Sequence, residues 1–218
     1  MKNKLKYMAL CLSLLIGVGA CSEEEIAYSA GEENKEVILQ LNCQLQTNQE
    51  VIVSRASTAE NRLNDLHFYV FNAAGELTGY KKLVATESSP IPTPGPETVT
   101  VKAITGEAYI YALANLNSTI YYLDDADKNK LTGIDEADVA GSSLTRDEFL
   151  AIDFKRQYGN ASHIISPNPT DGQFMMSGYL NGGKAVTITA GTNGAGVISE
   201  SNVIRLYRIC LLYTSPSP

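Results

Sequence analysis

The sequence is poor in the side chains that most enzymes use for catalysis. It contains no tryptophan and only two histidines, His67 and His163, which lie far apart and have no serine or cysteine nucleophile motif beside them. His67 lies within an aromatic run and is expected to be a packed or an edge residue. The Gly-rich segment 191–196 follows a predicted strand with no helix after it, which indicates a turn rather than a phosphate site. We therefore predict that the protein is not an enzyme and takes no cofactor.

The sequence also lacks an apolar run long enough to span a bilayer. Residues 7–16 are almost all apolar and follow three lysines, which is typical of a secretory signal peptide and too short for a stable membrane span. The small residues Val18-Gly19-Ala20 then precede Cys21. This pattern resembles the lipobox of bacterial lipoproteins, in which the cysteine is acylated. The resemblance predicts a signal peptide over residues 1–20 and lipid on Cys21; the alternative is an ordinary signal peptide with a chance cysteine.

Basic residues are outnumbered by acidic ones. The chain has 17 Lys and Arg against 24 Asp and Glu. Because residues 1–20 contain three lysines and no acid, the rest carries 14 basic and 24 acidic residues, a net charge of −10. A protein that neutralises phosphates needs a basic patch, so we expect no nucleic-acid partner.

The four cysteines predict neither a disulfide framework nor a metal site. Cys11 lies in the predicted signal peptide and Cys21 is the predicted lipid site. Cys210 lies in a tail, residues 210–218, that breaks the strand pattern and matches one reading frame of a common sequencing adapter. We expect the native sequence to stop near residue 209, with a natural Pro-rich tail as the alternative. Cys43 remains alone on an apolar strand face and is expected to be a core residue.

The segment after Cys21 is acidic and has little to bury. Ser22, Glu23, Glu24 and Glu25 follow the cysteine directly, and residues 21–35 read as a flexible tether. The acidic run resembles the surface-export signal of lipoproteins in one Gram-negative phylum. The alternative is a solvated linker.

From residue 36 the pattern changes to strict alternation, which predicts a half-buried strand. Its polar face carries Gln40, Asn42 and Gln44, with Ile38 as an apolar exception. Its apolar face carries Val37, Leu39, Leu41, Cys43 and Leu45.

Further strands are predicted over 66–71, 77–83, 98–103, 108–114, 173–180, 184–190 and 203–209. One helix is predicted by Thr145 and Glu148, a capping box ahead of Phe149. Many short strands with turn residues between them indicate an all-β fold. We predict a Greek-key-like β-sandwich of about seven strands over residues 36–209, with one short helix in a long loop region.

A calcium-type spacing occurs at Asp125, Asp127, Asn129 and Glu136. Lys130 occupies the sixth place, where the sharp turn of such a loop needs glycine, and no helix signals flank the segment. We therefore expect a polar surface loop here and predict no metal.

Several segments follow one another in a characteristic order: the lipobox with its acidic run, the alternating strand 37–45, the loop with Arg55, and the segments 64–77, 108–116 and 174–178. Taken together, they resemble the N-terminal domain of fimbrillins, the subunits of type V pili, including the major-fimbria and Mfa1-like branches. Each motif is loose by itself, and their joint order over residues 36–209 carries the likeness.

The resemblance implies a maturation and assembly route. A fimbrillin is exported as a lipoprotein, an arginine-specific protease cuts after the first strand region, and a strand of another subunit fills the vacated groove. Here Arg55 and Ala56 would flank the cut, with Arg62 as the second choice, whereas the plain alternative makes both arginines solvated loop residues. The displaced strand would be the alternating one, with its five apolar side chains.

The resemblance also implies a structural role: a subunit of a cell-surface pilus, anchored in the outer membrane through its lipid, that acts in adhesion. The expected partners are other fimbrillin subunits and host or bacterial surface ligands. The C-terminal domain that holds the donor strand in this family is expected to be missing from this chain. The alternative is a monomeric surface lipoprotein that binds a glycan or a host protein, with aromatic platforms on 66–71 and 109–122.

Overall fold

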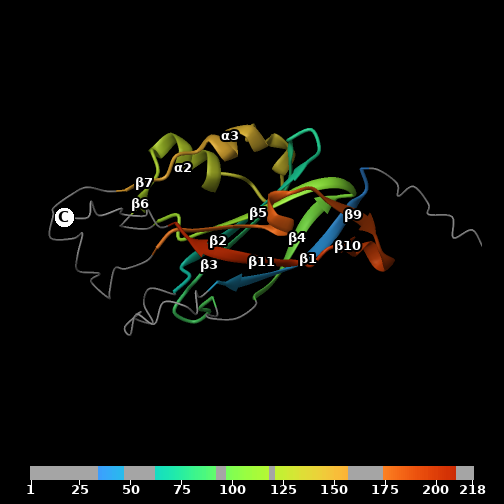
Figure 1. Cartoon of the computed structure of the whole chain (residues 1–218), viewed down its shortest axis with the longest axis horizontal. Coiled ribbons are helices and arrows are strands. Elements are labelled where there is room, and N and C mark those ends of the chain that lie inside the picture. Colours follow the sequence, from blue (N-terminus) through green and yellow to red (C-terminus); the bar gives the residue numbers. More distant parts are fainter. Residues whose placement is uncertain (1–33, 47–61, 92–96, 118–120, 157–173, 210–218) are drawn as a thin grey trace, which may run out of the picture. The chain divides into compact units, whose positions relative to one another are not determined.

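The computed structural model describes residues 34–46, 62–91, 97–117, 121–156 and 174–209, all within one compact unit (Figure 1). The predicted signal peptide, Cys21, Ser22–Glu25, Arg55, Ala56 and the tail 210–218 lie outside these residues. In the described part of the chain, no helix is both long and apolar enough to cross a bilayer.

Strands are the commonest element of the described chain. The strands are β1 (Glu36–Leu45), β2 (Asp65–Asn72), β3 (Leu77–Val84), β4 (Glu97–Ile104), β5 (Gly106–Ala114), β6 (Tyr121–Tyr122), β7 (Lys155–Arg156), β8 (Met176–Tyr179), β9 (Val186–Ala190), β10 (Gly196–Ile198) and β11 (Val203–Arg208). The helices are α2 (Asp125–Thr132) and α3 (Arg146–Ala151), and the 3-10 helices are η2 (Val139–Gly141), η4 (Leu180–Gly183) and η5 (Thr192–Gly194). The all-β class with a short helix is confirmed.

Nine strands form one continuous sheet. Its main path is β10-β9-β5-β8-β11-β1-β4, and the hairpin of β2 and β3 joins it through β5. Strand β5 is long enough to pair with β2 on one side, and with β9 and then β8 on the other. Among these ladders the β1–β11 pair is parallel and the others are antiparallel.

The sheet curls back on itself, so the two expected sandwich layers are two parts of one sheet. Strands β3 and β4 approach so closely that a Cβ on Gly79 would collide with the backbone oxygen of Lys102. The inner face encloses a core that draws on β1, β2, β4, β5, β9 and β11. The number of strands exceeds the prediction because β6, β7 and β10 are only two or three residues long and have no periodicity to detect.

A second apolar cluster lies on the outer face of the sheet and includes residues of α2 and α3. Tyr69 and Phe71 of β2 belong to it, whereas Phe68 and Val70 belong to the inner core. Both faces of β2 are therefore buried, as its aromatic and apolar sequence predicts. Phe149 of α3 packs against the rings of Tyr69 and Phe71, at centroid distances of 4.9 and 5.5 Å.

The helical segments give one confirmation and one correction. The capping box that precedes α3 is present: Thr145 Oγ1 accepts from Glu148 N at 3.3 Å, and Glu148 Oε2 accepts from Thr145 N at 3.1 Å. The surface loop expected over 125–132 is instead helix α2. Leu131 is its buried residue, so the segment shows no apolar periodicity, and tertiary packing forms the helix rather than a sequence signal.

Candidate functional site

The strand with the cleanest alternation, β1, is paired on both of its edges. β1 pairs antiparallel with β4 over Glu36–Cys43 and parallel with β11 over Asn42–Leu45 (Figure 1). An isolated parallel bridge between Ile38 and Ala195 extends this second edge. β1 is thus an inner strand with hydrogen-bonded neighbours on both sides.

The structure places the five apolar side chains of β1 in the inner core. Leu39 and Leu41 have no exposed surface, and Ile38, on the opposite face, is 40% exposed. Gly196 lies directly under the strand, because a Cβ there would come within 2.9 Å of Val37 Cγ2 and closer still to Leu39. All five inward side chains are buried: Val37, Leu39, Leu41, Cys43 and Leu45.

Removing β1 would therefore expose a groove with two unpaired edges, on β4 and on β11. Each large apolar side chain contributes roughly 1.5–3 kcal/mol when fully buried. Four or five such groups together rival the ~5–15 kcal/mol that separates a folded domain from its unfolded state. A chain without β1 would thus be poised to accept a replacement strand by β-augmentation.

The bond after Arg62 lies in a segment that hydrogen bonds and a buried residue hold in place. Its side chain is exposed, but its carbonyl oxygen accepts a hydrogen bond from Asn115 Nδ2 at 3.0 Å, and Leu63 is buried. Asn115 Oδ1 accepts from Asn64 N at 2.8 Å, and its Nδ2 also donates to the Phe174 carbonyl at 2.9 Å. A protease needs an accessible, extended chain, and this clamp holds the Arg62–Leu63 bond against the core.

The role of Asn115 was not predicted from the sequence, although a signal for it exists. It directly follows β5 and has a φ of 59°, a backbone conformation that asparagine tolerates better than most residues. An asparagine that ends an apolar strand is therefore a candidate for a structural turn with a hydrogen-bonding side chain.

His67 is a packed residue, one of the two predicted alternatives. It is buried, its Nδ1 lies 2.8 Å from the Tyr80 hydroxyl, and its Nε2 lies 3.4 Å from Asp65 Oδ1. Burial alone would raise the pKa of Asp65, but the hydrogen bonds with His67 and with the Leu116 N–H lower that pKa below its ordinary value. These groups hold one another in the core and leave no nitrogen of His67 for a substrate.

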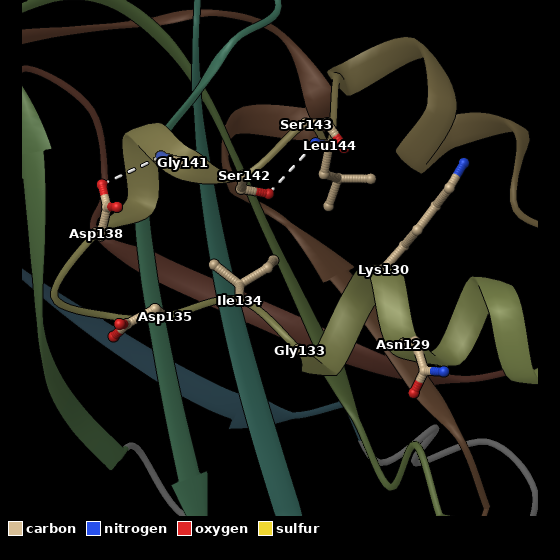
Figure 2. Close-up of a pocket in the computed structure, with 10 residues that line it drawn as sticks. All are labelled: Asn129, Lys130, Gly133, Ile134, Asp135, Asp138, Gly141, Ser142, Ser143 and Leu144. Carbon is tan, nitrogen blue, oxygen red and sulfur yellow. Dashed lines mark hydrogen bonds between the residues drawn. The ribbon is translucent and has the colours of Figure 1, made fainter.

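A cavity of about 340 Å³ lies where α2, η2 and the segment before α3 meet (Figure 2). Polar side chains that line it accept hydrogen bonds from nearby backbone N–H groups. Asp138 Oδ1 accepts from Gly141 N at 3.2 Å, and Ser142 Oγ accepts from Leu144 N at 3.3 Å, as Figure 2 shows. Lys130 points away from these groups to Glu148, 3.3 Å from its Oε1. The cavity has no convergent set of side chains for catalysis.

The calcium-type spacing does not form a loop. Asp125, Asp127 and Asn129 lie on α2, and Glu136 accepts from Lys81 Nζ at 2.7 Å and from Lys82 N at 2.8 Å. Burial opposes the charge on Glu136, yet the contacts with Lys81 and Lys82 lower its pKa. Among the described residues, no three His, Cys, Asp or Glu side chains are grouped to hold a metal ion.

The described side chains of the aromatic platforms in the alternative hypothesis are largely inaccessible; the side chains of residues 118–122 lie outside the described part. The rings of Phe68, Tyr69 and Phe71 are buried on both sides of β2. Tyr111 is also buried, and the Arg146 guanidinium covers the Tyr109 ring at 3.7 Å. Strand β2 therefore cannot offer a binding surface.

Comparison with solved structures finds likenesses at low identity. The tip fimbrial protein Mfa3 from Porphyromonas gingivalis is 17% identical, with a TM-score of 0.48 over 80% of this chain and 49% of that one. A fimbrial assembly protein from Parabacteroides distasonis is 14% identical, with a TM-score of 0.43 over 80% of this chain and 54% of that one. The fimbrial anchor protein Mfa2 from P. gingivalis is 12% identical, with a TM-score of 0.40 over 78% of this chain and 49% of that one. The chain thus spans about half the length of these proteins.

A comparison with curated proteins finds no match. A sequence profile of the major fimbrial subunit protein (FimA) family, in contrast, matches residues 40–208. This match runs from the middle of β1 to the end of β11, across the whole curled sheet. The chain therefore belongs to the FimA major fimbrial subunit family.

Proposed function

We propose that this chain is a structural subunit of a cell-surface pilus, and that β1 is a strand that a protease releases so that a neighbouring subunit can replace it. In this proposal Cys21 carries the lipid that holds the precursor in the outer membrane. Ser22–Glu25 direct it to the cell surface. Cleavage between Arg55 and Ala56 then separates β1 from the rest of the domain.

The observation that carries the proposal is the position of β1. It lies between β4 and β11, it contributes an entire row of side chains to the core, and its pairing with β11 is parallel. A parallel neighbour needs a long crossover connection, and here almost the whole domain lies between β1 and β11 in sequence. Once the chain is cut after β1, only non-covalent contacts hold the strand. Family membership and the arginine-containing segment between β1 and β2 support the same conclusion.

The test is maturation of the full-length native protein by an arginine-specific protease. We expect N-terminal sequencing to find Ala56 as the new first residue, and denaturing gels run without boiling to show ladders of subunits. The Arg55→Lys variant keeps the charge but removes the cleavage site, so it should stay intact and monomeric. Arg62→Lys should mature normally, because Asn115 and the core protect that bond.

An intact, lipid-blocked N-terminus on a protein that is only monomeric would contradict the proposal. It would favour the alternative, a surface lipoprotein that binds a glycan or a host protein. Tyr179 and Tyr207, which are 49% and 43% exposed on neighbouring strands β8 and β11, would then be the aromatic residues to test for binding.

A further inference from the structure

The alternation of β1 defines which face is buried but not which register is correct. A strand shifted by two residues in the groove would still turn apolar side chains inward. In β1 such a shift would exchange the positions of Leu39, Leu41 and Cys43, which differ in size but not in character. The inner face therefore opposes such a shift only through the sizes of its side chains, and polar contacts that can add to the choice of register lie on the outer face.

On that outer face Asn42 bridges both neighbours of β1. Its Oδ1 accepts from Thr98 Oγ1 of β4 at 2.8 Å, and its Nδ2 donates to Asn202 Oδ1, just before β11, at 3.4 Å. Asn202 also accepts from Asn42 N through its carbonyl at 2.9 Å and donates from Nδ2 to the Gln40 carbonyl at 3.1 Å. Thr98 and Asn202 thus hold the centre of the strand from opposite sides.

The side chain that completes this bridge must accept on one side and donate on the other. An amide does both at once; a carboxylate only accepts, and an aliphatic side chain does neither. The backbone bonds of Asn202 would form with any residue at this position. The hydrogen bonds with Thr98 Oγ1 and with Asn202 Oδ1, in contrast, need the side chain of Asn42, so they depend on which residue lies there.

Resting on the proposed function, we propose that Thr98 and Asn202 form a register clamp that selects, in any strand occupying the groove, an asparagine at the position of Asn42. A two-residue shift of β1 would place Gln40 or Gln44 there, and the extra methylene of glutamine would displace its amide from the position that the Asn42 amide occupies between the two partners. The partner that fits is an extended strand of a neighbouring subunit, with apolar residues at alternate positions and an asparagine on its outer face. The clamp sets the register, while the buried side chains supply most of the affinity.

The first experiment measures retention of a replacement strand. The full-length protein is cleaved with the arginine-specific protease and incubated, under reducing conditions, with a fluorescent synthetic peptide of residues 36–45. We expect the Asn42→Leu and Asn42→Asp peptides to leave about tenfold faster than the parent peptide, because one or two hydrogen bonds are lost. Gln44→Leu, on the same exposed face, is the matched control and should leave at the parent rate. In a Thr98→Val protein the difference between the peptides should shrink.

The second experiment reads the register itself. In the native pairing Gln44 lies opposite Arg205, and Tyr207 is two residues further along β11. Peptides with Cys43→Ala and Gln44→Cys should form a disulfide with Arg205→Cys protein and not with Tyr207→Cys protein. Adding Asn42→Leu to the peptide should spread the cross-linking to Tyr207→Cys.

The outcomes separate the two proposals. If no peptide enters the cleaved protein, strand exchange itself is wrong and the proposed function fails. If peptides enter but Asn42→Leu is retained and cross-linked like the parent peptide, strand exchange stands and the register clamp is wrong.

Discussion

At the scale of single residues, a few buried polar side chains hold the connections of the fold in place. Asn115 holds the segment that leads into β2, because its Oδ1 accepts a hydrogen bond from Asn64 N. Asp65 holds the segment that follows β5, because its Oδ1 accepts from Leu116 N at 2.8 Å. Both are nearly inaccessible to water, so each unmade hydrogen bond would leave an unsatisfied group in the core. This makes them sensitive positions for mutation.

Replacing Asn115 with alanine should destabilise the domain by about 1–3 kcal/mol, because the Arg62 and Phe174 carbonyls and the Asn64 N–H lose their partner. Urea denaturation measures this loss. Limited digestion with trypsin should at the same time reveal a new cut after Arg62.

Two controls separate the amide from backbone strain. Asn115→Gly keeps the positive φ without strain and should still expose Arg62. Asn193→Ala places alanine at a similar φ of 58° on the surface and should leave Arg62 protected. If Arg62 is as well protected in Asn115→Gly as in the parent, the hydrogen bonds of the Asn115 amide have no role in protection.

The lowered pKa of Asp65 predicts a pH dependence with a definite sign. A carboxyl whose pKa is lower in the folded state stabilises the fold above its unfolded pKa of about 3.9, and this contribution is lost as the pH falls through the folded pKa. Asp65→Asn should therefore be less stable than the parent at pH 7 and should lose less stability on acidification below about pH 4.

Urea denaturation of both proteins from neutral to acidic pH measures the difference. Glu107→Gln, which removes an exposed carboxylate, is the control and should follow the parent curve. Equal acid sensitivity of Asp65→Asn and the parent would show that Asp65 does not contribute in this way.

At the scale of elements, β1 is the segment on which the proposal depends. Its inward side chains belong to the inner core, yet it is joined to β2 only through the segment that would be cut. Its neighbours β4 and β11 have no direct ladder with each other. Among the described strands, β1 alone occupies the position between β4 and β11.

Truncation of one inward side chain of β1 should be costly. Leu41→Ala is expected to reduce the free energy of unfolding by about 2–5 kcal/mol, because Leu41 is completely buried. Ile38→Ala on the opposite face should change it by only about 0.5 kcal/mol. Similar losses from both variants, in urea denaturation, would show that β1 does not bury one face as described.

The close contact between Gly196 and β1 predicts a compensating pair. Gly196→Ala should destabilise the domain by about 1–3 kcal/mol, because the added methyl meets Leu39 and Val37. In a Leu39→Ala background the same change should cost less, since space is then available. Additive losses in this double-mutant cycle would contradict direct contact between position 196 and β1.

At the scale of the whole molecule, the proposed cleavage would convert an intramolecular strand into a bound peptide. Covalent connection keeps β1 at an effective concentration of about millimolar, and this advantage disappears once the chain is cut. In the cleaved protein, we expect β1 to be lost at urea concentrations below the unfolding midpoint of the intact chain. Size-exclusion chromatography with mass spectrometry would detect the shorter chain. Arg55→Lys protein treated in the same way should retain β1, and release of β1 from both samples would show that cleavage is irrelevant.

The sequence by itself determined the local features. Alternation gave the buried face of β1, and the apolar aromatic run of β2 indicated burial on both sides, because side-chain direction in a strand follows directly from position in the sequence. The capping box likewise predicted the start of α3, because its hydrogen bonds join residues only three positions apart in the sequence.

Tertiary structure decided everything that joins distant segments. No local pattern indicates that β1 lies between β4 and β11, that Asn115 holds Arg62, or that residues 125–132 form a helix around one buried leucine. Strand partners and buried hydrogen bonds depend on which surfaces meet after the chain has collapsed, and the period of a sequence carries no record of that choice.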